Sequence, residues 1–180
     1  MKKILVITSG KGGVGKTTTA INLGAAINYF GKDVVVIDAN LTTPNVGIHL
    51  NSPEVPITLN HVLMKKVEPF EAVYEHHSGL KIIPASISIR ELKNAKSERL
   101  KDFKKSFKEL ADYIIVDSAA GLGNEALSAI ELADEIIIVT NPELPALTDA
   151  LKTIKIADEL DKPIKGIIVK IGRASCRERV

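Results

Sequence analysis

Short apolar runs rich in β-branched residues recur along the chain, each bounded by Gly, Asp, Asn or Pro. Nearly all positions in these runs are apolar, rather than every second one, which is typical of strands buried on both faces of a sheet. The pattern predicts six buried strands, at Ile4–Thr8, Val34–Asp38, Leu80–Pro84, Tyr113–Asp117, Glu135–Thr140 and Lys165–Val169.

Between most of these runs, apolar residues recur every three or four positions, which is the period of an amphipathic helix. The clearest helical segments are Thr17–Phe30, Ser97–Leu110, Asn124–Ala133 and Ala146–Leu160. Strands that alternate with helices predict an α/β fold, with a mostly parallel twisted sheet covered by helices on both faces. Ligands of such three-layer folds bind at the carboxyl ends of the strands.

The stretch from Leu41 to Gly79 is the least regular part and contains four prolines. We expect a mobile loop and a surface insertion there, with one short helix near Leu59–Lys65. The chain has 180 residues, of which 45% are hydrophobic and 26% charged, and it shows no repeat or linker. This composition predicts one folded domain.

No apolar stretch approaches the ~20 residues that a membrane-spanning helix needs. The opening apolar run, Ile4–Ile7, is also far too short for a secretory signal. We therefore expect a cytoplasmic protein.

A glycine-rich loop, Gly10-Lys11-Gly12-Gly13-Val14-Gly15-Lys16-Thr17-Thr18, follows the first predicted strand and opens a predicted helix. It fits G-x-x-x-x-G-K-[ST] in the strand–loop–helix context that this phosphate-binding motif requires. The glycines let backbone N–H groups surround phosphates, while Lys16 neutralises phosphate charge and Thr17 ligates Mg²⁺. All nine residues are therefore predicted to bind a nucleotide.

Two predicted strands end in aspartate, at Asp38 and Asp117. A buried strand seldom ends in an unpaired acid, so both carboxylates are candidate Mg²⁺ ligands together with Thr17. Asp38 and the nearby Asn40 are also candidate catalytic residues beside Lys11 and Lys16. Capping of the turn after the strand is the alternative role for Asp38 and Asn40.

The string KGGVGKTT resembles the deviant Walker A motif of the MinD/ParA family of P-loop ATPases. The resemblance covers nearly all of residues 2–169, and two further segments, Ile82–Ser86 and Thr140–Glu143, favour the MinD branch. It implies that ATP is the nucleotide and that Asn141 contributes to its site. It also implies a homodimer formed around ATP, in which Lys11 reaches the phosphates of the partner.

Two positions depart from the family pattern. The family usually has D-x-D after the second strand, and Asn40 stands in place of the second aspartate; Ala119 replaces a proline after Asp117. An amide orients water but cannot accept a proton as a carboxylate does. We therefore expect slow ATP hydrolysis, and a binding module that holds ATP with little hydrolysis remains an alternative.

The last ten residues, IGRASCRERV, differ from the rest of the chain and contain its only cysteine, Cys176. The peptide is also the in-frame translation of a common short-read sequencing adapter. We interpret residues 171–180 as a non-native read-through tail, and residues 1–170 as the first part of a longer P-loop ATPase domain. A genuine basic tail for nucleic acid or acidic lipid is the alternative.

Setting the tail aside removes three arginines and one glutamate from totals of 24 basic and 22 acidic residues, which leaves 21 of each in residues 1–170. The overall charge therefore predicts no partner. Those residues contain no cysteine, which excludes a disulfide framework and a thiolate metal site. A nitrogenase iron protein and an arsenite pump subunit are excluded for the same reason.

The resemblance implies an ATP-dependent dimerising switch that controls placement of the cell-division site. Its partners would be a regulatory protein and the membrane, reached through a C-terminal amphipathic helix that this chain lacks. The protein would then be cytoplasmic and peripheral at the cell membrane. A ParA-type partition ATPase that binds DNA and an Mrp-type iron–sulfur cluster carrier remain alternatives.

Other conspicuous residues carry no functional prediction. The lysine-rich segment 93–108 has an apolar stripe and a solvated face, so DNA binding there is disfavoured. His61, His76 and His77 lie apart from other metal-ligating residues and are interpreted as surface residues.

Overall fold

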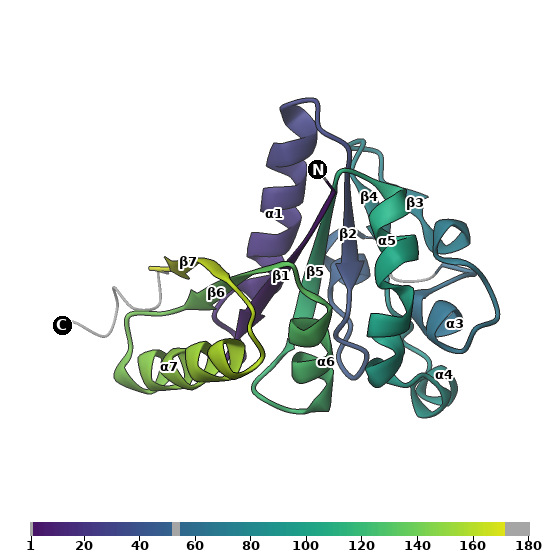
Figure 1. Ribbon diagram of the computed structural model, residues 1–180. Coiled ribbons are helices and arrows are strands. Elements are labelled where there is room, and N and C mark those ends of the chain that lie inside the picture. Colours follow the sequence, from purple (N-terminus) through teal and green to yellow (C-terminus); the bar gives the residue numbers. More distant parts are fainter. Residues whose placement is uncertain (1, 52–54, 172–180) are drawn as a thin grey trace.

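A seven-stranded sheet forms the centre of the computed structural model, which describes residues 2–51 and 55–171 (Figure 1). The strands lie in the order β3-β4-β2-β5-β1-β6-β7, and all neighbours are parallel except β3 and β4. Their bounds are β1 Lys3–Ser9, β2 Val34–Asp38, β3 Tyr74–Glu75, β4 Lys81–Ile83, β5 Tyr113–Ala120, β6 Glu135–Thr140 and β7 Ile164–Val169.

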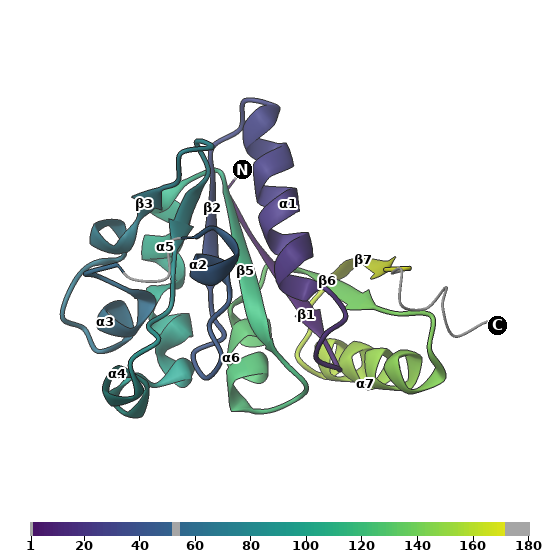
Figure 2. The same ribbon diagram turned by 180° about the vertical axis from the view of Figure 1, so that it is seen from behind.

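Helices cover both faces of this sheet (Figures 1 and 2). One buried apolar cluster lies between the sheet and α1, and a larger one lies beneath α3, α5, α6 and α7. The predicted three-layer α/β fold is thus confirmed. The α-helices are α1 Lys16–Tyr29, α2 Val46–His49, α3 Leu59–Leu63, α4 Ile89–Asn94, α5 Lys104–Leu110, α6 Asn124–Leu132 and α7 Leu144–Glu159; the 3₁₀ helices are η1 Pro69–Ala72 and η2 Ser97–Phe103.

The sheet differs from the prediction at its two edges. The two-residue strand β3 was not predicted, because it has too few residues to show a period of two. The prediction of six buried strands is wrong for β7, whose residues alternate between half-buried and exposed. As the outermost strand, β7 has a neighbour on one side only, and Ile167 and Val169 each remain 49% exposed.

The segment between β4 and β5 also differs in detail. The predicted helix Ser97–Leu110 is divided into η2 and α5, although its stripe faces the core as expected, with Leu100 and Phe107 fully buried. The irregular stretch 41–79 is not simply a surface insertion. Its predicted short helix is present as α3, and Leu59, Val62 and Leu63 of this helix are fully buried.

Two sequence predictions find no answer in the described structure. Residues 172–180 of the interpreted read-through tail lie outside the described residues. Among the residues that are described, no helix is both long enough and apolar enough to cross a membrane.

The central strands bring three chain segments to one edge of the sheet. β5 lies between β2 and β1, so the chain that leaves each of these strands emerges beside its neighbour. The register of β2 and β5 pairs Asp38 with Asp117. Helix α1 packs closely on this region at Gly24, where a Cβ atom would lie 2.6 Å from Cγ2 of Val36.

Candidate functional site

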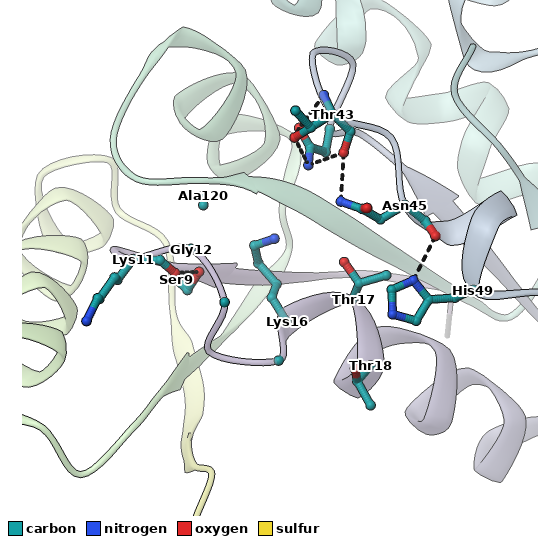
Figure 3. Close-up of a pocket in the computed structure, with 13 residues that line it drawn as sticks. Ser9, Lys11, Gly12, Lys16, Thr17, Thr18, Thr43, Asn45, His49 and Ala120 are labelled. Atoms are coloured by element: carbon teal, nitrogen blue, oxygen red, sulfur yellow. Dashed lines mark hydrogen bonds between the residues drawn. The ribbon is translucent and has the colours of Figure 1, made fainter. Parts of the chain in front are cut away.

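The loop between β1 and α1 forms one wall of a pocket of about 390 Å³ (Figure 3). Gly13 and Gly15 have φ angles of 77° and 93°, a left-handed conformation that strongly favours glycine. Helix α1 begins immediately after Gly15 and has no acidic residue in its first turn. Its positive end therefore faces the pocket without a compensating charge, as an anion site requires. The loop residues that line the pocket are Lys11, Gly12, Gly13, Gly15, Lys16, Thr17 and Thr18.

The other two residues of the predicted loop support it from behind. Val14 is 3% exposed and belongs to the apolar cluster beneath α1. Gly10 packs against α7, where an added Cβ would lie 2.5 Å from the backbone oxygen of Asp149. These two residues therefore shape the loop, and they do not line the pocket.

Lys16 and Thr17 both contact the carboxylate that ends the buried part of β5. The Thr17 hydroxyl donates a hydrogen bond to Oδ2 of Asp117 at 2.6 Å, and Nζ of Lys16 lies 3.5 Å from Oδ1. Burial raises the pKa of Asp117, although the charge of Lys16 and the hydrogen bonds from Thr17 and Lys16 oppose the shift. The three side chains form a compact group behind the phosphate loop.

Asp38 is completely buried and supports the loop that follows β2. Its carboxylate accepts backbone N–H groups from Asn40 at 3.1 Å, Asn45 at 2.8 Å and Val46 at 2.9 Å. Burial, and then the neighbouring Asp117, raise the pKa of Asp38 to about 7 against the effect of these hydrogen bonds. Asp38 thus takes the turn-capping position that the sequence offered as an alternative, beside the second carboxylate.

Residues 40–45, here named the switch loop, form the opposite wall of the pocket. The Asn40 amide donates to the backbone oxygen of Thr43 at 2.7 Å and to its hydroxyl at 2.9 Å. Oδ1 of Asn40 accepts from the Thr43 N–H at 3.3 Å and from the hydroxyl at 3.1 Å. Asn45 also donates to the Thr43 oxygen, at 2.8 Å (Figure 3). Asn40, Thr43 and Asn45 all line the pocket.

The donor groups of this site suit a magnesium phosphate. Mg²⁺ prefers oxygen ligands and commonly takes only one or two carboxylates from a protein. Thr17, Asp117 and Asp38 supply a hydroxyl and two carboxylates. The described residues contain no cluster of three or more His, Cys, Asp or Glu side chains that could hold a metal alone. A metal bound jointly with phosphates therefore fits this group better than an isolated metal site.

The chain matches the protein family described as "ParA: NUBPL iron-transfer P-loop NTPase" over residues 1–179. The chain belongs to the ParA family of P-loop NTPases. An uncharacterised ATP-binding protein of Methanocaldococcus jannaschii is 42% identical over 165 residues, which are 92% of this chain and 62% of that protein. The septum site-determining protein MinD of Thermotoga maritima is 38% identical over 180 residues, covering 96% of this chain and 65% of that protein.

Solved structures of this family share the architecture. The septum site-determining protein MinD of Pyrococcus horikoshii, complexed with Mg-ADP, superposes with a TM-score of 0.89 at 33% identity. The match covers 99% of this chain and 77% of that chain. The present chain spans about three fifths of the length of the curated relatives described above.

The extra lysine of this ParA-family loop lies at the rim of the pocket. Lys11 forms an ion pair with Glu143 at 3.2 Å, and each side chain is 45% exposed. An exposed pair of this kind contributes only about 0–1 kcal/mol, so a stronger anion can displace Glu143. Figure 3 shows Lys11 directed away from Lys16. Asn141 lies near Glu143 after β6 but is not among the residues lining the pocket.

Sequence reasoning missed several residues of the site. Thr43, Asn45 and His49 line the pocket, and their position soon after Asp38 was the available signal. Glu143 and Glu125 gave no such signal, because their contacts with Lys11 and with the switch loop join positions far apart in the chain.

Proposed function

We propose that this chain binds ATP with Mg²⁺ and hydrolyses it as a dimerising, MinD-like switch. The supporting observation is the different setting of two lysines in one phosphate loop. Lys16 is 8% exposed and contacts Asp117, whereas Lys11 stands at the rim in a weak, exposed ion pair. Lys16 is therefore placed to serve the nucleotide of its own chain, and Lys11 is accessible to a second one.

The side chains would divide the work as follows. Lys16 and the loop N–H groups would hold the β- and γ-phosphates, and Thr17 and Asp117 would hold Mg²⁺, which neutralises phosphate charge when bound. Asp38 would support the metal site through Asp117 and the switch loop. Asn40 would orient the attacking water without removing its proton.

Lys11 would complete the site only in a dimer. A cation that arrives from the partner would stabilise charge on the transferred phosphoryl group, so hydrolysis would depend on assembly. Following the names of its septum site-determining relatives, we propose that the switch controls placement of the division site. The membrane surface and a regulatory protein would be its partners.

Nucleotide binding and hydrolysis of the wild type, Lys16→Ala and Lys11→Ala test this proposal. The wild type should bind ATP and ADP with Mg²⁺, and Lys16→Ala should lose binding of both. Lys11→Ala should retain binding but lose hydrolysis and the ATP-dependent dimer seen by sedimentation. A wild type that binds no nucleotide would refute the proposal, and normal turnover by Lys11→Ala would refute the dimer mechanism.

Two other functions within the family make different predictions. A partition ATPase would bind DNA without sequence preference, with affinity that falls steeply as salt rises. An iron–sulfur carrier needs paired cysteines, and this chain contains only Cys176. DNA retardation at two salt concentrations therefore separates the first alternative from vesicle binding, and the cysteine count disfavours the second for this chain.

A further inference from the structure

A glutamate outside the phosphate loop holds the switch loop from its far side. Oε2 of Glu125 accepts the backbone N–H of Leu41 at 3.0 Å and that of Thr42 at 3.3 Å. Oε1 accepts the Thr42 hydroxyl at 2.5 Å. Both carboxylate oxygens are therefore engaged by two consecutive residues that lie more than 80 positions earlier in the chain.

The position of Glu125 connects two parts of the nucleotide site. Glu125 is the second residue of α6, which starts four residues after the end of β5 at Ala120. The segment between them, residues 121–123, continues the strand that carries Asp117. A hydrogen-bonded link between α6 and the switch loop therefore joins the chain after Asp117 to the chain after Asp38.

The carboxylate is not used to cap its own helix. Gly123 precedes α6 and provides no side-chain cap, and all three hydrogen bonds given above run to the switch loop. Hollows flank the contact on both sides, one of about 430 Å³ reaching Asn40 and Thr43 and one of about 620 Å³ reaching Glu98. Packing around the contact is thus open, which leaves the hydrogen bonds as its main restraint.

We propose that Glu125 is a positioning residue that keeps the switch loop in the shape that presents Asn40 and Thr43 to the nucleotide pocket. This inference rests on the ATP hydrolysis proposed above. Asn40 organises the loop from within, and Glu125 fixes its outer side to α6. Without Glu125, the loop remains attached through Asp38 but loses its link to the segment that follows Asp117.

Hydrogen exchange tests the contact without requiring catalysis. In nucleotide-free protein, Glu125→Ala should speed exchange of the Leu41 and Thr42 amides by roughly 10-fold or more, as expected for hydrogen bonds to a charged acceptor. Glu98→Ala removes an exposed glutamate from the rim of the adjacent hollow and is the matched control. It should leave these amides unchanged, and unaltered exchange in Glu125→Ala would overturn the inference.

Kinetics then test positioning. Glu125→Ala should lower kcat about 10- to 100-fold, the range expected for a small displacement of a positioned group, while KM stays within about twofold. Thr42→Val combined with Glu125→Ala should be no slower than the poorer single variant, since both remove the same link. Faster exchange with a normal kcat would overturn the inference.

A wild type that binds ATP without hydrolysing it would be a failure of the proposed hydrolysis, visible before any variant is compared. The inference is then decided by the affinities of a slowly hydrolysed ATP analogue and of ADP. Glu125→Ala should weaken the analogue more than ADP, because the switch loop is proposed to meet the terminal phosphate. Equal affinities of wild type and variant for the analogue would overturn it.

Discussion

Asn40→Asp restores the residue that relatives usually have at this position, yet the structure predicts that it destabilises this chain. The orientation of the Asn40 amide is fixed by its partners, because the Thr43 N–H can only donate and the Thr43 carbonyl can only accept. An aspartate keeps both accepted hydrogen bonds but cannot make the two donated ones.

The magnitude follows from those contacts. Two lost hydrogen bonds correspond to about 1–3 kcal/mol. The Thr43 carbonyl retains the hydrogen bond from Asn45 at 2.8 Å, and the Thr43 hydroxyl can donate to a carboxylate more strongly than to an amide. These two effects move the expected loss to the lower half of the range, about 1–2 kcal/mol.

Urea unfolding at pH 7.5 without Mg²⁺ measures this loss. The control is Asn22→Asp, which introduces the same charge on the exposed face of α1 and should change stability by less than about 0.5 kcal/mol. A variant Asn40→Asp as stable as the wild type would show that the amide contacts do not organise the switch loop. Turnover of the same variant tests hydrolysis separately: if the rate does not rise, Asn40 is not what limits it.

Three further predictions concern other parts of the chain. Gly24→Leu should unfold the chain or lower its stability by more than about 3 kcal/mol, since even a Cβ would meet Val36 at 2.6 Å; thermal melting of this variant beside the exposed Gly31→Leu decides this. Glu143→Ala should leave ADP affinity within about twofold, because an exposed pair with Lys11 contributes little; fluorescent-nucleotide titration checks it, and a tenfold change would contradict it. Asp134→Asn should lose about 1 kcal/mol at pH 7, as worked out below.

The Asp134 prediction depends on pH through a lowered pKa. Partial burial opposes ionisation of this carboxyl, but hydrogen bonds from Lys108, the Ile4 N–H and Lys104 outweigh it and lower the pKa from 3.8 to about 2. The full shift corresponds to about 2.4 kcal/mol, and solvent exposure reduces it to about 1 kcal/mol. Because the folded pKa is lowered, this stability is present above pH 3.8 and is lost as pH falls towards 2. Unfolding at pH 7 and pH 2.5 should show the difference between wild type and variant shrinking.

Local sequence signals predicted the fold well where the signal is repeated along the chain. The phosphate loop, five of the six expected strands as buried elements, and helices α1, α6 and α7 follow from apolar periodicity and from glycine at fixed spacing. The errors lie where packing decides structure. Strand β7 is half exposed because of its place in the sheet order, and Leu59 and Leu63 are buried because a distant segment covers them.

The candidate site was predictable to the extent that its residues follow strand ends. Lys16, Thr17 and Asp117 were expected to lie together, and the structure places them in contact. The pairing of Lys11 with Glu143 could not be predicted, since the two residues meet only after β6 aligns beside β1. Their roles in binding and hydrolysis stay predictions.

The charge balance of the site gives a physical reason for an amide at position 40. Asp38 and Asp117 are paired in register, both are fully buried, and each already has a raised pKa. A third carboxylate at position 40 would add like charge two residues from Asp38 and make ionisation of all three harder. Asn40 avoids this repulsion and supplies the donors that close the switch loop. Mg²⁺ would reduce the repulsion, so the penalty of Asn40→Asp should be smaller in its presence; an equal penalty with and without Mg²⁺ would mean that lost hydrogen bonds, and not charge, account for it.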